Sequence, residues 1–282
     1  MNGRRGFDAC RVAVVTGGGR GIGRALCRLL QGIAETVVVA DRDGDAARAV
    51  AEEIGGVART LDVSIEPELA LLIEEIERDF APIDLFVSNA GVGFGDGAAG
   101  AAAPDGRSGE PGDRWAACWS VNVMAHVYAA RHLVPRMGAR GGGYLVNTAS
   151  AAGLLCQIGD AAYTATKHAA VAFAESLAIT HGEEGIQVSV VCPQAVATRM
   201  IGMPDDSDLT HGGGFGGNDV DGILRAEDAA AIIVDGVRAG RFLILTHPEV
   251  ATYLERKAND RDRWIRGMQR FRGRLAKDES GG

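Results

Sequence analysis

The chain has 282 residues, a formal net charge of −8 and a hydrophobic share of 46%, values that suit one large α/β domain with a well-filled core. The overall negative charge argues against a general affinity for nucleic acid or for an anionic membrane. No apolar stretch approaches the length of a signal peptide or a membrane span, and the five cysteines form no CxxC pair. We therefore expect a cytoplasmic protein whose cysteines are small buried residues, without a disulfide framework or a zinc site.

Apolar, β-branched runs alternate with segments of helical period along the chain. Strands are expected at residues 12–16, 36–41, 57–62, 83–88, 143–148, 186–191 and 242–246. Helical period appears at residues 46–54, 66–80, 113–137, 161–181 and 226–239. This alternation predicts an α/β fold with a parallel sheet covered on both faces. The fold class is a single doubly wound, Rossmann-type sheet of about seven strands.

The last part of the chain differs from the rest in charge and pattern. We predict a Rossmann-type domain over residues 1–248 and a helical tail over residues 249–282. The tail carries nine Lys and Arg against six Asp and Glu, and no nucleic-acid motif accompanies this basic excess. We expect its apolar stripe to pack on the same domain or on a neighbouring subunit. The stripe consists of Trp264, Met268, Phe271 and Leu275.

Two glycine-rich segments interrupt the alternation, at residues 93–112 and 198–225, and the second contains a run of glycines after His211. Both segments follow the carboxyl ends of strands, where ligands bind in open α/β sheets. They are either walls of a pocket or tolerated surface insertions. For the second segment a mobile pocket wall is favoured, because motif residues flank it.

The first predicted strand runs directly into a glycine-rich turn at residues 16–23 and then into a helical pattern. Gly17, Gly21 and Gly23 let the backbone turn sharply and let a pyrophosphate approach the N–H groups at the start of the helix. The spacing differs from the common GxGxxG pattern, so a plain tight turn is the alternative. The strand–turn–helix context favours the nucleotide site.

Asp41 ends the second predicted strand. A carboxylate at this place can accept hydrogen bonds from the ribose hydroxyls of the adenosine and repel a 2′-phosphate, which favours NAD over NADP. Arg20 and Arg42 argue in the opposite direction, because either could pair with a phosphate. Asp41 could also simply cap the following helix.

Tyr163 and Lys167 are four residues apart in a segment of helical period, which places them one turn apart on the same face. A phenol with a pKa of about 10 is a poor base at neutral pH. A nearby ammonium, helped by a positive nicotinamide ring, favours the phenolate. An isolated YxxxK pair is weak evidence, but this one follows Ser150, at the end of the fifth predicted strand.

Taken together, these motifs resemble the short-chain dehydrogenase/reductase family, of the NAD-dependent alcohol dehydrogenase or carbonyl reductase type. The likeness covers roughly residues 11–246, and the motifs occur in the order of the family. They are the turn at residues 16–23, Asp62-Val63, Asn89-Ala90-Gly91, Asn122, Ser150, Tyr163-xxx-Lys167 and residues 193–198.

The resemblance implies that residues 1–248 form the catalytic and dinucleotide-binding domain of an oxidoreductase with four catalytic residues. Tyr163 would be the general acid/base, and Lys167 would lower its pKa and hold the nicotinamide ribose. Ser150 would hydrogen-bond the substrate oxygen, and Asn122 would hold a water that links Lys167 to solvent.

The resemblance also implies a site for NAD and no metal, in agreement with six histidines that show no ligand spacing. Asp62 and Val63 would flank the adenine, and Asn89-Ala90-Gly91 would lie beneath the ribose. Thr198 would reach the carboxamide of the nicotinamide. The implied cofactor-binding residues are Gly17, Arg20, Gly21, Ile22, Gly23, Asp41, Asp62, Val63, Asn89, Ala90, Gly91, Tyr163, Lys167, Pro193 and Thr198.

One departure from the family pattern is Gln194, which stands where the family usually has Gly after Pro193. Four residues after the fifth predicted strand are expected to face the substrate, and most of them are apolar. They are Ala152, Leu154, Leu155 and Gln157. The sequence thus predicts hydride transfer between NAD(H) and a largely apolar secondary alcohol or ketone.

Two other functions fit the same scaffold: an isomerase or dehydratase that uses the same tyrosine, and a regulator that binds NAD without turnover. The four catalytic residues argue against the regulator. As partners we expect a small-molecule alcohol or carbonyl compound and a second copy of the chain, in a dimer or tetramer. The interface is predicted at helices 113–137 and 161–181, because the second carries Ala169, Ala170, Ala172, Ala174 and Ala178.

Overall fold

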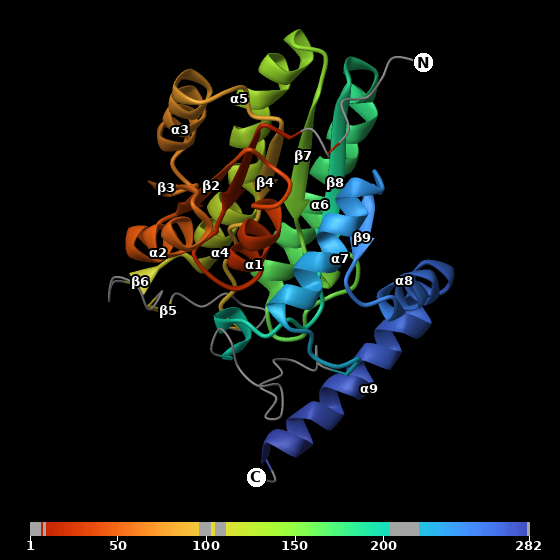
Figure 1. Cartoon of the computed structure of the whole chain (residues 1–282). Helices are drawn as coiled ribbons and strands as arrows, with labels where there is room; N and C mark the ends of the chain where they lie inside the picture. Colours follow the sequence, from red (N-terminus) through yellow and green to blue (C-terminus); the bar gives the residue numbers. More distant parts are fainter. Residues whose placement is uncertain (1–6, 8–9, 96–102, 105–110, 204–219, 281–282) are drawn as a thin grey trace.

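The computed structural model describes Phe7 and residues 10–95, 103–104, 111–203 and 220–280 (Figure 1). Within them lies a seven-stranded parallel sheet with the strand order β3-β2-β1-β4-β7-β8-β9. The predicted doubly wound Rossmann-type sheet is therefore confirmed. Its strands are β1 (Val12–Thr16), β2 (Thr36–Asp41), β3 (Val57–Thr60), β4 (Leu85–Ser88), β7 (Gly143–Thr148), β8 (Ile186–Cys192) and β9 (Leu243–Leu245). A separate antiparallel pair joins β5 (Ala103–Pro104) and β6 (Pro111–Gly112).

Helices cover both faces of the sheet. Side chains alternate along β1, so Val12 and Val14 pack in the layer of α3, α5 and α6, while Ala13 and Val15 pack in the layer of α1, α2 and α7. The covering helices are α1 (Gly21–Leu30), α2 (Gly44–Ile54), α3 (Glu66–Asp79), α5 (Ala125–Ala139), α6 (Ala161–His181) and α7 (Ala226–Arg238).

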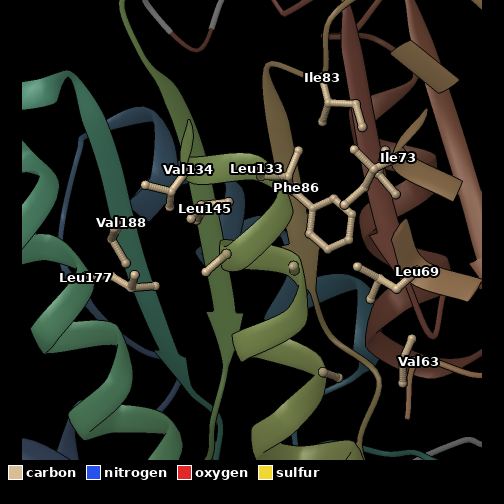
Figure 2. Packing of buried hydrophobic residues seen from close by; sticks show 14 of the residues in the cluster. Val63, Leu69, Ile73, Ile83, Phe86, Leu133, Val134, Leu145, Leu177 and Val188 are labelled. Carbon is tan, nitrogen blue, oxygen red and sulfur yellow. The ribbon is translucent and has the colours of Figure 1, made fainter. Parts of the chain in front are cut away.

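The first of these layers is centred on Phe86 of β4, which lies among Ile73 of α3 and Leu133 of α5 (Figure 2). All three side chains are fully buried. Burying a side chain of this size contributes about 1.5–3 kcal/mol. The layer therefore fixes the helices that carry the functional residues against the middle of the sheet.

The helix expected over residues 113–137 is not continuous. It consists of α4 (Arg114–Trp119), a π-helical turn η2 (Ser120–Met124) and α5. A π-helical turn adds one residue to the hydrogen-bonded ring and is frequent at functional sites. The third strand is shorter than expected, because the Asp62 carboxylate accepts from the Ser64 N–H and hydroxyl and turns the chain after Thr60.

The tail forms two helices, α8 (Glu249–Asn259) and α9 (Arg261–Ser280), and α9 extends past the carboxyl edge of the sheet (Figure 1). The two helices are separated at Asp260. Its carboxylate accepts a hydrogen bond from the Arg263 N–H at 2.9 Å and so caps the start of α9. Among the described residues, no helix combines the length and the apolar character that a membrane crossing needs.

The expectation for the two glycine-rich segments falls mostly outside the described residues, and the expectation for the cysteines is corrected at one position. Residues 96–102, 105–110 and 204–219, which make up most of the two glycine-rich segments and include His211, lie outside the described part of the chain. Four cysteines are buried as expected, but Cys156 is exposed, because it lies on a loop rather than in the core.

Candidate active site

The carboxyl edge of the sheet holds a cavity of about 920 Å³. It lies where the strand order reverses, with β2 on one side of β1 and β4 on the other, the place where ligands bind in doubly wound sheets. Of the predicted site residues, all but Asn122 line it. They are Gly17, Arg20, Gly21, Ile22, Gly23, Asp41, Asp62, Val63, Asn89, Ala90, Gly91, Ser150, Tyr163, Lys167, Pro193 and Thr198.

The glycine turn is closely packed against the end of β4. Gly17 has a φ of +64°, and a Cβ placed on Gly23 would overlap the Gly17 carbonyl oxygen. The Asn89 side-chain amide donates to the Thr16 carbonyl at 3.1 Å, and the Thr16 hydroxyl accepts from the N–H groups of Asn89 and Ala90. The turn is thus held open at the start of α1, where no side chain caps the first N–H groups.

Asp41 lies at the end of β2 and accepts one hydrogen bond on each carboxylate oxygen. Its donors are the Gly19 N–H and the Asp43 N–H, both at 3.0 Å. The helix α2 is capped by Asp43, whose carboxylate accepts from Ala46, so Asp41 is not the cap of this helix. Asp43 also pairs with Arg20 at 2.6 Å.

Tyr163 and Lys167 lie on the same face of α6, with the Lys167 ammonium 5.5 Å from the centre of the Tyr163 ring. Lys167 is buried and donates to the Thr148 carbonyl at 3.0 Å, and burial lowers its pKa to about 8. Burial raises the pKa of Tyr163 to about 12, while a hydrogen bond with Ser150 acts in the opposite direction. Burial therefore favours the protonated form of Tyr163, whereas a positive group beside the ring, such as the Lys167 ammonium, favours the phenolate.

Ser150 follows β7 by two residues rather than ending it. Its hydroxyl accepts from the Ala152 N–H at 3.1 Å and donates to the Pro193 carbonyl at 3.4 Å. These bonds tie the ends of β7 and β8 together. They also hold the hydroxyl beside Tyr163, where both groups can reach one substrate oxygen.

Asn122 lies beneath the cavity and is fully buried. Its side-chain oxygen accepts from the Val92 N–H at 2.9 Å, and its amide donates to the Val92 carbonyl and to Thr166. The π-helical turn brings this amide to the segment after β4, where a Cβ placed on Gly91 would lie 3.3 Å from Lys167 Nζ and 3.4 Å from Asn122 Oδ1. The predicted water beside Asn122 stays a prediction.

Asp160 is a residue of the site that the sequence analysis missed. It is buried, caps α6 by accepting from the Tyr163 N–H, and accepts from the N–H groups of Phe94 and Gly95, all at 2.9 Å. It thereby fixes the segment after β4 against the ring of Tyr163. The cap itself had a sequence signal, an Asp before a helical pattern.

The substrate side of the cavity is mainly apolar. Of the four residues expected there, Ala152, Leu155 and Gln157 line the cavity, whereas Leu154 packs against the core, and Cys156 is a lining residue that was not expected. Three of the four residues of the predicted stripe on α9 line the same space, and Leu275 does not. Further apolar lining comes from Met200, Ile201, Trp264, Met268 and Phe271.

No group of three or more His, Cys, Asp and Glu in the described part of the chain is arranged to hold a metal ion. What the cavity brings together is a nucleotide-type glycine turn, a phenol and a buried ammonium. These groups can bind a polar cofactor at one end and move a proton at the other.

Known proteins resemble this chain in sequence. A family model described as short chain dehydrogenase matches residues 11–207. The chain is 34% identical over 259 residues to 1-deoxy-11-beta-hydroxypentalenate dehydrogenase of Streptomyces exfoliatus, covering 89% of this chain and 88% of that protein. It is 30% identical over 207 residues to 3beta-hydroxysteroid dehydrogenase 2 of Eggerthella lenta, covering 71% and 76%.

A solved structure gives the same result for the fold. A short chain dehydrogenase/reductase from Burkholderia phymatum, in complex with NAD, superposes with a TM-score of 0.77 and 27% identity, over 91% of this chain and 95% of that one. The chain belongs to the short-chain dehydrogenase family and is an oxidoreductase that acts on CH–OH groups.

Proposed function

We propose that the protein transfers a hydride between NAD(H) and a largely apolar secondary alcohol or ketone, with Tyr163 as the general acid/base. The observation that carries this proposal is that Tyr163, Ser150 and Lys167 open into the same cavity as the glycine turn and Asp41. A proton carrier and a nucleotide site in one cavity suit the oxidation of an alcohol, in which the oxygen loses a proton and the carbon loses a hydride.

The residues present fit a dinucleotide. A Cβ on Gly23 would overlap the Gly17 carbonyl oxygen, so glycine is needed there for the turn to pack at the start of α1. The uncapped N–H groups of α1 can bind a phosphate. Asp41 has lone pairs left for ribose hydroxyls after its two backbone bonds. Bound NAD would accept the hydride of the alcohol, and its reduced form would return it to the ketone.

The chain's own residues would handle the proton. In oxidation, Tyr163 Oη takes the proton of the substrate hydroxyl while the substrate C–H bond releases its hydride; in reduction, the same atom returns the proton to the carbonyl oxygen. Ser150 Oγ holds that oxygen, and the Lys167 ammonium stabilises the phenolate form.

The substrate class follows from the cavity and from the relatives. The cavity of about 920 Å³ includes the proposed nucleotide site, and its substrate side is mainly apolar, which suits an apolar alcohol. The two named relatives are a hydroxypentalenate and a hydroxysteroid dehydrogenase. We therefore propose a compact, multi-ring secondary alcohol as substrate.

The proposal is tested by following the absorbance of reduced nicotinamide with NAD and a panel of cyclic, terpenoid, steroidal and short aliphatic alcohols. We expect strong activity on a few multi-ring alcohols. Conversion of a substrate without net reduction of NAD would instead indicate an isomerase or dehydratase. Binding of NAD with neither outcome would indicate a regulator.

NAD should be preferred over NADP by at least about tenfold in affinity, equivalent to about 1.4 kcal/mol, and Asp41 is the expected cause. Asp41→Ala should bring the two affinities together, with Arg42, which lines the cavity, then able to approach a 2′-phosphate. Isothermal titration with both cofactors measures this preference. Asp45→Asn is the matched control, since Asp45 is exposed on α2 and outside the cavity lining; equal use of NAD and NADP by the unmodified protein would contradict the assignment.

The protein is also proposed to be a dimer or tetramer that assembles through α4, α5 and α6. Ala170 and Ala174 turn out to pack inside their own subunit, but Ala172 is exposed and Ile179 is 84% exposed on α6. Light scattering should give two or four times the mass of one chain, and Ile179→Glu should lower that mass. A single-chain mass for the unmodified protein would refute this assembly.

The division into a domain over residues 1–248 and a tail over residues 249–282 also remains a proposal, as does the cytoplasmic location. The tail is nevertheless connected to the proposed site, because residues of α8 and α9 line the cavity.

A further inference from the structure

Two side chains of α8, Tyr253 and Lys257, lie one turn apart on the same face and bond the segments around the cavity. Tyr253 is part of the cavity lining, and Lys257 is only 7% exposed. We call this pair the α8 brace. Each of its side chains bonds a different wall of the cavity.

Lys257 bonds the wall that follows β7. Its ammonium donates to the carbonyl oxygens of Leu154 at 2.6 Å and Leu155 at 2.7 Å, and lies 3.3 Å from His168 Nε2. His168 Nδ1 lies 2.9 Å from the Thr164 carbonyl and must donate there, so Nε2 is left as an acceptor. Each of the three ammonium protons of Lys257 thus has an acceptor, which compensates for the burial of the charge.

This wall carries substrate-side residues and is also joined to the catalytic helix. The Gln157 N–H donates to the Thr164 hydroxyl at 2.9 Å, one residue after Tyr163. Leu155 and Gln157 both line the cavity. The position of residues 154–157 therefore sets how far the wall stands from the proton carrier.

Tyr253 bonds the wall that follows β8. Its hydroxyl donates to Asp221 Oδ1 at 2.8 Å, and Asp221 Oδ2 accepts from the Gln194 side-chain amide at 2.9 Å. Gln194 follows Pro193 at the end of β8 and lines the cavity. The residue that departs from the family pattern is thus the one that connects the end of the sheet to α8.

We propose that Tyr253 and Lys257 are positioning residues that fix the distance between the two walls and so select multi-ring alcohols over small ones, an inference that rests on the proposed function. An ammonium buried on backbone carbonyls is an expensive way to attach a helix, because apolar contacts would do so at lower cost. Its bonds to the backbone of residues 154–155 hold the wall in one place whatever side chains it carries. The adjoining helix α9 then closes the space with Trp264 and Met268.

The kinetic test uses Lys257→Met and Tyr253→Phe, which keep most of each side chain's volume. With a multi-ring alcohol that the enzyme oxidises, KM should rise about tenfold or more in each variant, a loss of about 1.4 kcal/mol of binding. With a small secondary alcohol, kcat of Lys257→Met should stay within about twofold, since Lys257 is not part of the cavity lining. Glu255→Gln is the matched control, because Glu255 is exposed on the same helix.

A second measurement is independent of activity. Hydrogen exchange followed by mass spectrometry, on the full-length unliganded protein, should show faster exchange at residues 154–157 in Lys257→Met and at residues 220–224 in Tyr253→Phe. Each change should be confined to its own wall. General destabilisation would instead speed exchange across the sheet in both variants.

The two measurements separate the possible failures. The unmodified protein could oxidise no alcohol while hydrogen exchange still becomes faster at the expected wall in each variant. In that case the proposed function fails and the substrate role of the brace is overturned, whereas its bonding role stands. Unchanged exchange at both walls, or an equal rise in KM for the small and the multi-ring alcohol, overturns the brace itself while leaving the proposed hydride transfer intact.

Discussion

Turnover should fall by about 10²- to 10⁴-fold when Tyr163 is replaced by Phe, with the affinity for NAD almost unchanged. The substitution removes the phenolic oxygen, the atom proposed to carry the substrate proton, and leaves the ring. That ring is packed closely: a Cβ on Gly93 would lie 3.2 Å from Tyr163 Cδ2. The variant should therefore fold normally and lose the chemical step alone.

Steady-state rates with the preferred alcohol and titration with NAD measure the two effects. Tyr144→Phe is a suitable control, because Tyr144 is a buried tyrosine of β7 whose hydroxyl bonds Ser189 and which is not part of the cavity lining. If Tyr163→Phe kept more than about a tenth of the unmodified rate, another group would have to be the proton carrier.

Replacing Lys167 by Met should move activity and stability in opposite directions. The rate and the affinity for NAD should both fall, because the ammonium is proposed to stabilise the phenolate and to hold the nicotinamide ribose. Stability at neutral pH should rise. Burial lowers the pKa of Lys167 from 10.5 to about 8, so keeping the ammonium inside the protein costs about 3 kcal/mol below pH 8.

The gain is reduced by the lost hydrogen bond from the ammonium to the Thr148 carbonyl, worth about 1.5–3 kcal/mol because its donor is charged. A net gain of about 1 kcal/mol should raise Tm by roughly 2 °C for a chain of this size. The direction of the pH dependence follows from the lowered pKa of Lys167 in the folded state. The free-energy cost of burying its ammonium is complete below pH 8 and fades as pH rises towards 10.5. The Tm difference between variant and unmodified protein should therefore shrink over that range.

Thermal unfolding by calorimetry at pH 7 and at pH 10 tests this expectation. Lys277→Met, at an exposed position of α9, should show no such pH-dependent difference. A Tm difference for Lys167→Met that stayed constant across this range would mean that the ammonium is not destabilised by burial.

The sheet could be predicted from the sequence because each strand is a short β-branched run, and such runs are buried on both sides in a parallel sheet. The helix at residues 161–181 was predicted with the bounds that α6 has. The π-helical turn at Ser120–Met124 was missed, because one extra residue in the helical hydrogen bonding hardly changes the apolar pattern on either side.

The candidate site was predictable where its residues lie close together in sequence. The glycine turn and the pair Tyr163 and Lys167 are local patterns. Asp160 could be predicted as a helix cap, but its bonds to Phe94 and Gly95 join parts of the chain more than sixty residues apart. The role of Lys257 could not be predicted from the sequence, because lysine is almost always exposed. In addition, its acceptors include two backbone carbonyls, which every residue type has.

The order of the strands also bears on how such an enzyme can evolve. The residues proposed to choose between NAD and NADP all precede Val63, those proposed to move the proton lie between Asn122 and Lys167, and the α8 brace follows residue 249. Substitutions that share no contact usually combine additively, so a lineage can exchange its nucleotide without retuning its chemistry. Because the α8 brace is proposed to act through the cavity walls and not through the reacting groups, a lineage could also change its substrate by mutation near the end of the chain and keep its catalytic residues.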